Sequence, residues 1–319
     1  MSPDRSKTSQ PTTYLHLVQK CDNNPYYELH LPADSRPHGY LLPSTVAAIP
    51  WPPAFHVDHD SRPRRVTVLD SSAGTATAQT VNAAFADVVT RCIDGDLFHV
   101  LDGKHSEPFA VLGANYPVYI ERFASSLFGI TACGACLVAY VKDGDSGLKI
   151  WIAKRAAHLY SYPGCLDITV AGGVKAGVSP LETVVQEAME EASLEEGVMR
   201  AGVRACGVVT CMGITGDDWA GEKGLVMPEL LYLYEMEVGG DVVPRPHDEE
   251  VEGFRCLRVE EVREALLKGA FKPDAACVLV AFFIRHGIIT AENERDYVAI
   301  LEHLHRKLPF PVKPESHAR

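Results

Sequence analysis

The sequence contains no apolar run that approaches the roughly 18 residues needed to cross a membrane. Its polar start, MSPDRSKTSQPTTY, also lacks the apolar stretch of a secretory signal. Positive charge is scarce, because 42 Asp and Glu outnumber 30 Lys and Arg and give a formal net charge of −12. A general nucleic-acid binder needs a concentrated positive surface. We therefore expect a cytoplasmic protein that contacts neither a membrane nor a nucleic acid.

A cysteine framework is also missing. The nine cysteines are scattered, and their odd number argues against a fully paired secreted scaffold. Cys133 and Cys136 form the only close pair, and no second CxxC or His pair follows at the spacing of a zinc ribbon. Because this pair lies in the apolar, strand-like run TACGACLVAYV, we interpret both as buried structural thiols. Redox or metal chemistry is the alternative.

The length and composition fit a two-domain globular protein. A chain of 319 residues is too long for one ordinary core, and its 46% hydrophobic and 23% charged residues are typical of globular proteins. Near Ile130 the residue pattern changes from Pro-rich loops to strand-like runs. The predicted division is a flexible tail at 1–12, an N-terminal accessory domain at 13–130, a second domain at 131–290, and a C-terminal helix and tail at 291–319.

Hydrophobic periodicity and turn residues predict the elements of both regions. In the first region we expect helices at 15–22, 80–92 and 117–130 and a strand at 65–70. In the second we expect strands at 131–141, 148–156, 167–173, 203–214, 228–238 and 254–259, and helices at 259–269, 274–286 and 291–307. The turn DGDSG joins the first two of these strands as a hairpin. The second region therefore mixes strands and helices.

One helix of the second region carries an unusual number of carboxylates. In AGGVKAGVSPLETVVQEAMEEASL, which begins at Ala171, a serine and a proline start the helix. Glu187, Glu190 and Glu191 then stand at i, i+3 and i+4, so they project from one face and repel each other. A divalent cation such as Mg²⁺, which prefers hard oxygen ligands, would relieve this repulsion. The alternative is a solvated acidic helix face, and Glu182, about a turn and a half earlier, is expected to face solvent.

This stretch resembles the box of the Nudix hydrolases, whose pattern is G-x5-E-x7-R-E-U-x-E-E-x-G-U. In that family the box is a strand, loop and helix that binds Mg²⁺ for attack on a linkage like that of a nucleoside diphosphate. Glu187 matches the Glu after the box Arg, Glu190 and Glu191 match the E-E pair, and Leu194 is the closing aliphatic residue. The metal-binding end of the motif is therefore intact.

Three positions depart from the box, counted from Gly172 as its first glycine. Val178 stands where the first Glu belongs, Gln186 replaces the Arg, and Ser193 replaces the second Gly. Glutamine can hydrogen-bond a neighbouring carboxylate but brings no charge. We therefore expect activity to persist, with weaker metal binding.

The resemblance extends over nearly the whole chain. The stretches LVQKCDN, GYLLPS, ERFASSLFGI, YPGCLDITVAGG, MPELLYLYEMEV and FKPDAACVLVAFFIRHGIITAENERDY are similar to those of fungal and plant Nudix proteins related to thiamine pyrophosphokinase. This resemblance implies an α/β (α+β) fold: a Nudix α/β/α sandwich with a mixed sheet, preceded by a smaller N-terminal α/β accessory domain. It also implies a pyrophosphohydrolase that converts thiamine diphosphate, or its oxidised analogues, to the monophosphate and phosphate.

The resemblance further implies roles for individual residues. Mg²⁺, with Mn²⁺ as an alternative, would be held by Glu187, Glu190 and Glu191. Catalytic roles are expected for Glu190, Glu191 and Glu252, the last from the acidic loop HDEEVEGF. Substrate-binding roles are expected for Lys154, Arg155, Gly172, Gly173 and Glu229.

Each of these additional residues has a simpler interpretation as well. Lys154 and Arg155 match a basic strand end of the family, but a surface pair would look the same. The two glycines let backbone amides approach a ligand because they have no side chain. The same loop also offers Glu249 and Glu250, and an ordinary acidic loop is the alternative interpretation of Glu252. Glu229 is a second candidate for the later carboxylate that many Nudix enzymes use.

Two classes of function remain open at this point. The first is a Mg²⁺-dependent hydrolase with a small-molecule diphosphate substrate, either thiamine diphosphate or an oxidised nucleoside diphosphate such as an 8-oxo form. The second is a catalytically weakened Nudix module that binds a diphosphate or a protein partner, which the loss of the box Arg and Gly permits. A monomer or a homodimer is expected in either case.

Overall fold

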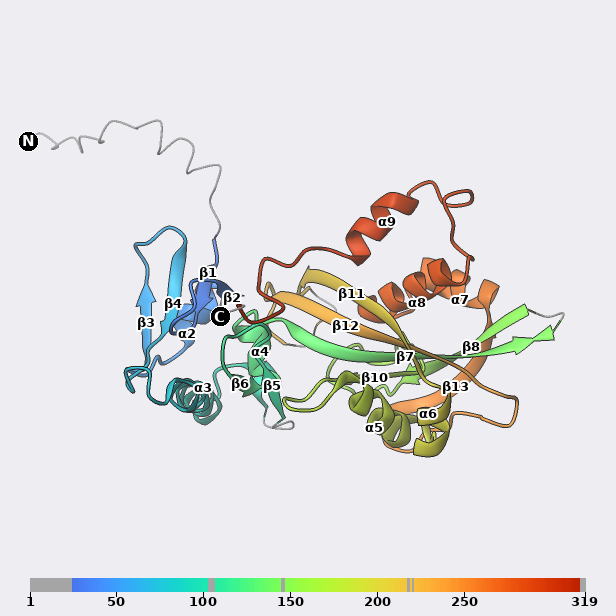
Figure 1. The fold of residues 1–319 in the computed structure, drawn as a ribbon, viewed down its shortest axis with the longest axis horizontal. Helices are drawn as coiled ribbons and strands as arrows, with labels where there is room; N and C mark the ends of the chain where they lie inside the picture. Colours follow the sequence, from blue (N-terminus) through green and yellow to red (C-terminus); the bar gives the residue numbers. More distant parts are fainter. Residues whose placement is uncertain (1–24, 103–106, 145–146, 217–218, 220, 316–319) are drawn as a thin grey trace, which may run out of the picture.

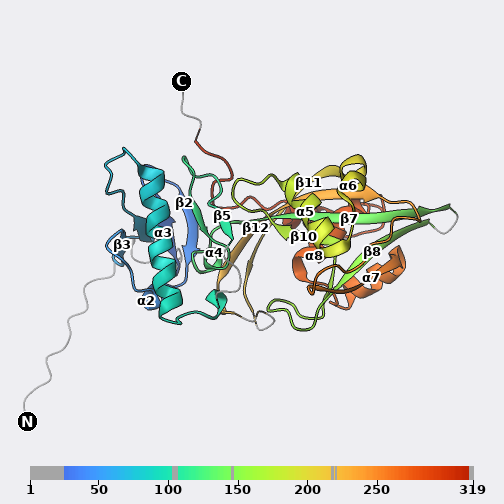
Figure 2. The same ribbon diagram turned by 90° about the horizontal axis from the view of Figure 1, so that it is seen from below.

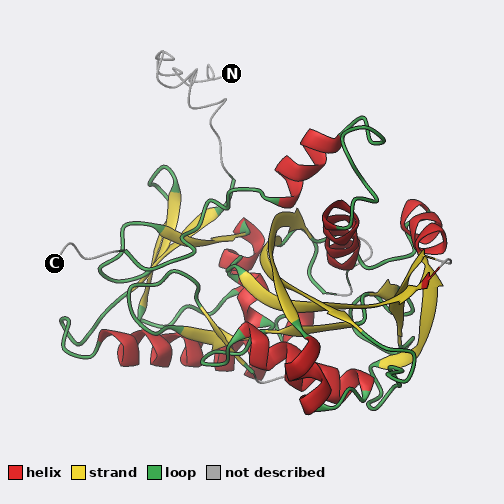
Figure 3. Ribbon diagram, turned by 45° about the vertical axis from the view of Figure 1, so that its right-hand side comes forward, coloured by secondary structure: helices red, strands yellow, loops and turns green. Residues whose placement is uncertain are grey.

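The computed structural model describes residues 25–102, 107–144, 147–216, 219 and 221–315. The predicted tail at 1–12 and the predicted helix at 15–22 lie outside these residues. A smaller N-terminal sheet and a larger sheet lie at opposite ends of an elongated molecule (Figure 1). Figure 3 shows the strands in two separate groups, with helices beside both.

The N-terminal sheet has the strand order β2-β1-β4-β3, in which β1 and β4 are parallel and the other pairs antiparallel. The long helix α3 inserts Val81, Phe85 and Val88 into the core that this sheet shares. The predicted strand at 65–70 and helix at 80–92 are confirmed as β4 and α3. The strands are β1 (Tyr27–His30), β2 (Pro37–Leu41), β3 (Phe55–Asp58) and β4 (Arg64–Val68), and the helices are α2 (Pro43–Ala48), α3 (Thr77–Asp94) and the short 3-10 helix η1 (His99–Leu101).

The helix predicted at 117–130 is wrong. Its first part is the strand β6 (Tyr119–Glu121), which pairs with β5 (Pro108–Ala110), and only its second part is helical, as α4 (Ala124–Leu127). The side chain of Glu121 stabilises the start of α4, because its Oε2 accepts a hydrogen bond of 2.8 Å from the backbone N–H of Ala124. The apolar periodicity alone does not reveal this change of element.

The larger sheet has the strand order β11-β12-β7-β8-β13, and the short strands β10 and β9 pair with β7 and β8. It is a mixed sheet, because β12 and β7 are parallel and the other pairs are antiparallel. The strand predicted at 167–173 is interrupted and forms β9 and β10. The strands are β7 (Ala132–Asp143), β8 (Gly147–Arg155), β9 (Leu166–Asp167), β10 (Val170–Gly173), β11 (Arg204–Ile214), β12 (Val226–Glu237) and β13 (Val251–Arg258).

Helices cover both faces of the larger sheet and give it a separate core on each side (Figures 1 and 2). Alternation along β12 sends Leu231 and Leu233 to one core and Tyr234 and Met236 to the other. This arrangement confirms the expected α/β/α layers behind a smaller N-terminal sheet domain. The helices are α5 (Pro180–Ala192) and α6 (Glu196–Gly202) on one face, α7 (Val259–Leu267) and α8 (Pro273–Arg285) on the other, and α9 (Tyr297–Leu304) beyond α8.

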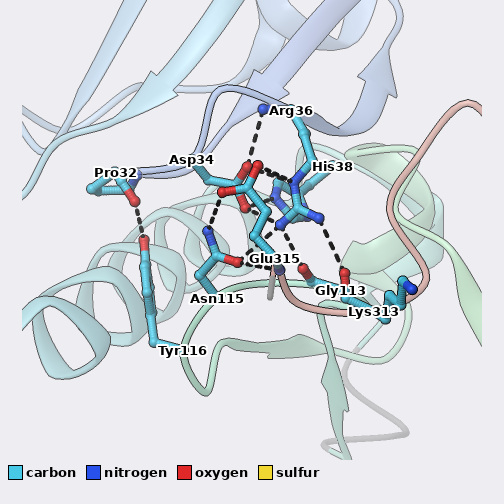
Figure 4. Close-up of polar contacts among 9 residues, drawn as sticks. All are labelled: Pro32, Asp34, Arg36, His38, Gly113, Asn115, Tyr116, Lys313 and Glu315. Carbon is cyan, nitrogen blue, oxygen red and sulfur yellow. Dashed lines mark hydrogen bonds and ion pairs between the residues drawn. The ribbon is translucent and has the colours of Figure 1, made fainter. Parts of the chain in front are cut away.

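The chain after α9 returns to the N-terminal sheet. Phe310 is buried there, with its ring 4.7 Å from that of Tyr40. Arg36 donates hydrogen bonds to Asp34 and to the backbone carbonyl of Lys313, and it also pairs with Glu315 (Figure 4). The C-terminal segment therefore ties the end of the second region to the first.

Candidate active site

The carboxylate-rich helix α5 begins and ends at recognisable signals. The Oγ of Ser179 accepts a hydrogen bond of 3.1 Å from the N–H of Glu182, and Pro180 follows at the first helical position. The helix ends at Ser193, whose φ of 52° lies in the left-handed region. Glycine adopts this conformation without strain, so a glycine would fit this position better than Ser193 does.

Glu187 lies directly against the strand β10. A Cβ atom on Gly172 would lie only 2.3 Å from the Cγ of Glu187, so only a glycine leaves room for this side chain. Burial raises the pKa of Glu187 to about 7, and the charge of Glu190 adds to this effect. The positive charges of Arg122 and Lys175 act in the opposite direction. The glycine thus forms a cradle for a carboxylate whose negative charge is poorly stabilised.

Glu191 lies deeper than Glu187 at the same end of the helix. Its Oε2 accepts a long hydrogen bond of 3.4 Å from the N–H of Ala171. Burial raises the pKa of Glu191 well above its ordinary value, and the carboxylates of Glu187, Asp167 and Glu250 raise it further. Glu191 also borders a cavity of about 10 Å³, close to the smallest space that holds one water molecule. The cavity is lined by Ala153, Arg155, Asp167, Ile168, Ala171, Glu191, Glu250 and Val251.

Glu190 lies on the exposed side of the same helix turn. Its Oε1 accepts a hydrogen bond of 2.8 Å from the Nε2 of Gln186. The prediction that Gln186 would hydrogen-bond a neighbouring carboxylate is therefore confirmed. The contact is with a residue one turn away, and it adds no positive charge to the site.

The donor set fits a divalent cation in its chemistry. Within the described part of the chain, no three Asp, Glu, His or Cys side chains are arranged closely enough to coordinate a metal ion. However, the oxygens of Glu187 and Glu191 are the hard ligands that Mg²⁺ prefers, and both carboxylates have raised pKa values because burial and neighbouring negative charge disfavour their ionised forms. A bound cation would supply the positive charge needed to stabilise the ionised forms of these two side chains.

The structure separates the two acidic residues that flank the start of β13. A β-bulge shifts the pairing between Val251 and Gly253, and Glu252 turns outward to form an exposed ion pair of 2.8 Å with Lys154. Glu250 instead lines the cavity beside Glu191. Sequence reasoning preferred Glu252 to Glu250, because the bulge that decides which side chain faces the cavity has no clear signal in the sequence.

Arg155 and Asp167 meet at the other side of this cavity. The NH1 of Arg155 lies 3.3 Å from the Oδ2 of Asp167, which is buried. Burial raises the pKa of Asp167, although the charges of Lys272 and Arg155 oppose the shift. Arg155 is thus near the box carboxylates, whereas Lys154 is occupied on the surface by Glu252.

The structure does not bring Glu229 to the box helix. This residue shares the face of β12 with Leu231 and Leu233, which is the face that α8 covers. Cys211 donates its thiol hydrogen to the Oε2 of Glu229 at 3.3 Å. Burial raises the pKa of Glu229 to about 7, with Asp274 adding to the shift and Lys272 opposing it. Its predicted contact with substrate stays a prediction.

Gly173 has a packing role in the structure. A Cβ atom here would lie 2.5 Å from the Cζ of Phe109, which belongs to β5 of the N-terminal region. The absence of a side chain therefore allows the two regions to approach each other beside the box. Any contact of Gly173 with substrate stays a prediction.

The close cysteine pair shows no sign of a reactive site. Cys133 and Cys136 are free thiols, half-buried and buried respectively. Burial raises the pKa of Cys133 to about 11 and that of Cys136 well above its ordinary value. Neither forms a thiolate readily near neutral pH, which supports their structural role.

Comparison with known proteins gives a family match within the larger domain. Residues 134–279 match the NUDIX domain family. The chain is 37% identical over 216 residues to an uncharacterized protein of Saccharomyces cerevisiae, an alignment that covers 66% of this chain and 63% of that protein. It is 32% identical over 214 residues to Nudix hydrolase 20, chloroplastic, of Arabidopsis thaliana, covering 66% of this chain and 54% of that protein. The alignments thus span less than two thirds of either relative.

One solved structure that this chain resembles is the NUDIX domain of Shewanella oneidensis NrtR, which is in complex with ADP ribose. It is 12% identical, covers 51% of this chain and 91% of that chain, and has a TM-score of 0.37. None of the helices in the described part of this chain has the length and apolarity needed to cross a membrane. The cytoplasmic location stays a prediction.

Proposed function

We propose, from the Nudix domain at residues 134–279 and the geometry of its box helix, that this protein is a metal-dependent hydrolase of a phosphoric anhydride. The observation that carries the proposal is the placement of Glu187 against Gly172, with Glu191 beside it at a water-sized cavity. A solvated acidic face would have no need of a glycine cradle, and its carboxylates would not be partly enclosed.

Mg²⁺, or Mn²⁺ in its place, is the proposed cofactor. Glu187, Glu190 and Glu191 are the proposed ligands, and Glu250 is a better placed later carboxylate than Glu252 because it lines the cavity with Glu191. When bound, such an ion neutralises the diphosphate and makes a bound water more acidic. Rotation of the exposed Glu190 side chain away from Gln186 would bring a further oxygen to the ion.

The remaining chemistry falls to the chain's own residues. Glu191 and Glu250 both line the cavity, whose volume of about 10 Å³ is at the lower limit for one water, so either carboxylate would be placed to accept a proton from a water bound there. Arg155 is held beside this space by Asp167 and by the backbone carbonyl of Ser161, at 3.0 Å from its NH2. Its positive charge is suited to stabilise negative charge that develops on a phosphoryl oxygen.

For the substrate, we propose thiamine diphosphate or one of its oxidised analogues, which would give the monophosphate and phosphate. Support comes from the resemblance of sequence stretches along nearly the whole chain to Nudix proteins related to thiamine pyrophosphokinase. An oxidised nucleoside diphosphate is the alternative. The test is phosphate release from thiamine diphosphate, an oxidised analogue and an 8-oxo-nucleoside diphosphate, each with Mg²⁺ and with a chelator. Release that requires Mg²⁺ supports the hydrolase, and the best substrate identifies the class.

One observation favours a second function, a Nudix module that binds without hydrolysis. Gln186 replaces the box Arg and engages Glu190, and Ser193 occupies a left-handed position that suits glycine. Such a module would bind thiamine diphosphate in a calorimetric titration yet release no phosphate from any member of the panel. Phosphate release that is lost in Glu191→Gln would rule this function out.

A further inference from the structure

The N-terminal region docks directly onto the loop between β10 and the box helix. Phe109 of β5 forms an antiparallel bridge with Lys175, and the N–H of Ala176 donates a hydrogen bond of 2.8 Å to the carbonyl oxygen of Pro108. The ring of Phe109 fills the space above Gly173. The strand pair of β5 and β6 therefore continues onto the box loop, and it fixes the position of the residues that follow β6.

Arg122 is the first residue after β6, and it is held at this junction. Its backbone N–H donates a hydrogen bond of 2.8 Å to the carbonyl oxygen of Glu107. Its NH1 lies 3.4 Å from the Oε2 of Glu107, whose Oε1 is 2.8 Å from the Nζ of Lys175. The guanidinium also lies 5.7 Å and 5.6 Å from the ring centroids of Phe109 and Phe123. One carboxylate thus holds two cations, one from each region.

These two cations lie beside the box carboxylates. The guanidinium of Arg122 is next to the ring of Phe109, which fills the space above Gly173, and Glu187 packs against the adjacent Gly172. The positive charges of Arg122 and Lys175 both act on Glu187, and the charges of Glu187 and Glu190 both act on Lys175. The side chains of Arg122 and Lys175 remain 36% and 31% exposed, so each still presents N–H donors to solvent. A phosphate group that approaches Glu187 would therefore meet a fixed pair of positive side chains next to it.

We propose that Arg122, together with Lys175, binds the phosphate groups of the substrate, so that the N-terminal region completes the active site. This inference rests on the proposed hydrolase function and specifies which residues hold the diphosphate. Arginine suits this role because its planar guanidinium forms paired hydrogen bonds with phosphate oxygens. Arg122 acts as a substrate-binding residue, and the box carboxylates perform the chemistry.

The first test compares Arg122→Gln with wild type under Mg²⁺ for the best substrate of the panel. Loss of a charge-assisted hydrogen bond is expected to raise KM about tenfold or more, with a smaller change in kcat. Arg122→Lys, which keeps the charge, should recover part of the loss. Arg91→Gln is the matched control, because Arg91 forms a similar ion pair with Asp87 on α3, away from the box. Unchanged KM in Arg122→Gln would overturn the inference and leave the hydrolase function standing.

A second variant separates binding from a purely structural role. Glu107→Gln removes the carboxylate that competes for Arg122 and Lys175, so it should maintain or strengthen diphosphate binding even where it lowers the melting temperature. If Arg122 only holds the two regions together, Glu107→Gln and Arg122→Gln should weaken binding alike, which would overturn the inference.

Calorimetric titration with methylenediphosphonate, which is not hydrolysed, measures this binding without turnover. Weaker binding in Arg122→Gln supports the inference, even if the wild type releases no phosphate and the hydrolase function fails. Absence of binding to the wild type in Mg²⁺ would overturn both.

Discussion

The two faces of the larger sheet each enclose carboxylates, but they differ in how the negative charge is balanced. Beneath α8, Lys272 lies 2.8 Å from Asp274, and its charge also opposes the raised pKa of Glu229. Beneath α5, the charged groups that act most strongly on Glu191 are other carboxylates. Lys272 lies within the α8 cluster. The cations near the α5 cluster, Arg122, Lys175 and Arg155, are instead paired with Glu107 or Asp167, so the box carboxylates can accept a further cation from solution. This difference favours a structural ion pair beneath α8 and the proposed metal site beneath α5.

The largest expected effect on stability lies on the α8 face. Lys272→Met would leave Asp274 and Glu229 without their nearby cation. The side chains of Lys272 and Asp274 are 21% and 16% exposed, so we expect a loss of about 1 to 3 kcal/mol, below the value for a fully buried pair. The turnover of the folded variant should stay close to that of wild type. Chemical denaturation measures the loss, with Lys268→Met as the control, since Lys268 forms only an exposed ion pair with Glu264. Equal stability of the two variants would contradict the structural role of the α8 cluster.

Added metal should act on the α5 face. A ligand that binds only the folded state stabilises it by about 2.7 kcal/mol at a hundred times its dissociation constant. We therefore expect millimolar Mg²⁺ or Mn²⁺ to raise the melting temperature of the wild type, and to do so less in Glu187→Gln. Glu229→Gln should respond to metal as the wild type does. Melting curves that Mg²⁺ leaves unchanged would argue strongly against the site.

A change of pH should have a smaller effect on the stability of the metal-free protein than added metal has. The pKa of Glu187 and that of Glu229 are both raised to about 7, mainly by burial. Between the ordinary value near 4.5 and about 7, the folded state keeps a proton that the unfolded state has lost. Stability should therefore be greatest below this window and fall as pH rises through it, by at most about 1.4 kcal/mol per unit for each group.

Denaturation at several pH values in a chelator would show this slope. Glu187→Gln and Glu229→Gln should each reduce it, and saturating Mg²⁺ should reduce only the part that comes from Glu187. Stability that rises with pH over the same window would contradict the burial of these carboxylates. A Mg²⁺ effect on the Glu229 contribution would contradict the separation of the two faces.

Local pattern was enough to predict much of this arrangement. The spacing of Glu187, Glu190 and Glu191 and the Ser-Pro start predicted α5, and the strand-like runs predicted most of the mixed sheet. These features depend on neighbours within a few residues, which the sequence displays directly.

The features that the sequence did not reveal depend on long-range pairing. The bulge at Glu252 arises from the register of β13 against β8, and it turns Glu250 toward the cavity. The split of 117–130 depends on the pairing of β6 with β5. Arg122 reaches the box only because β5 docks on the loop at Lys175, which no local pattern shows.

The central claim is that the box carboxylates hold the metal ion that the hydrolysis requires, and Glu191→Gln tests it most directly. This change keeps the shape of the side chain and removes one charge, so turnover under saturating Mg²⁺ should fall by about a hundredfold or more. Metal-free stability should hold or rise, because repulsion with Glu187 is relieved. Glu182→Gln is the control on the same helix, where only an exposed ion pair with Arg200 is lost. Equal turnover in the two variants, or a loss in Glu191→Gln that unfolding explains, would contradict the account.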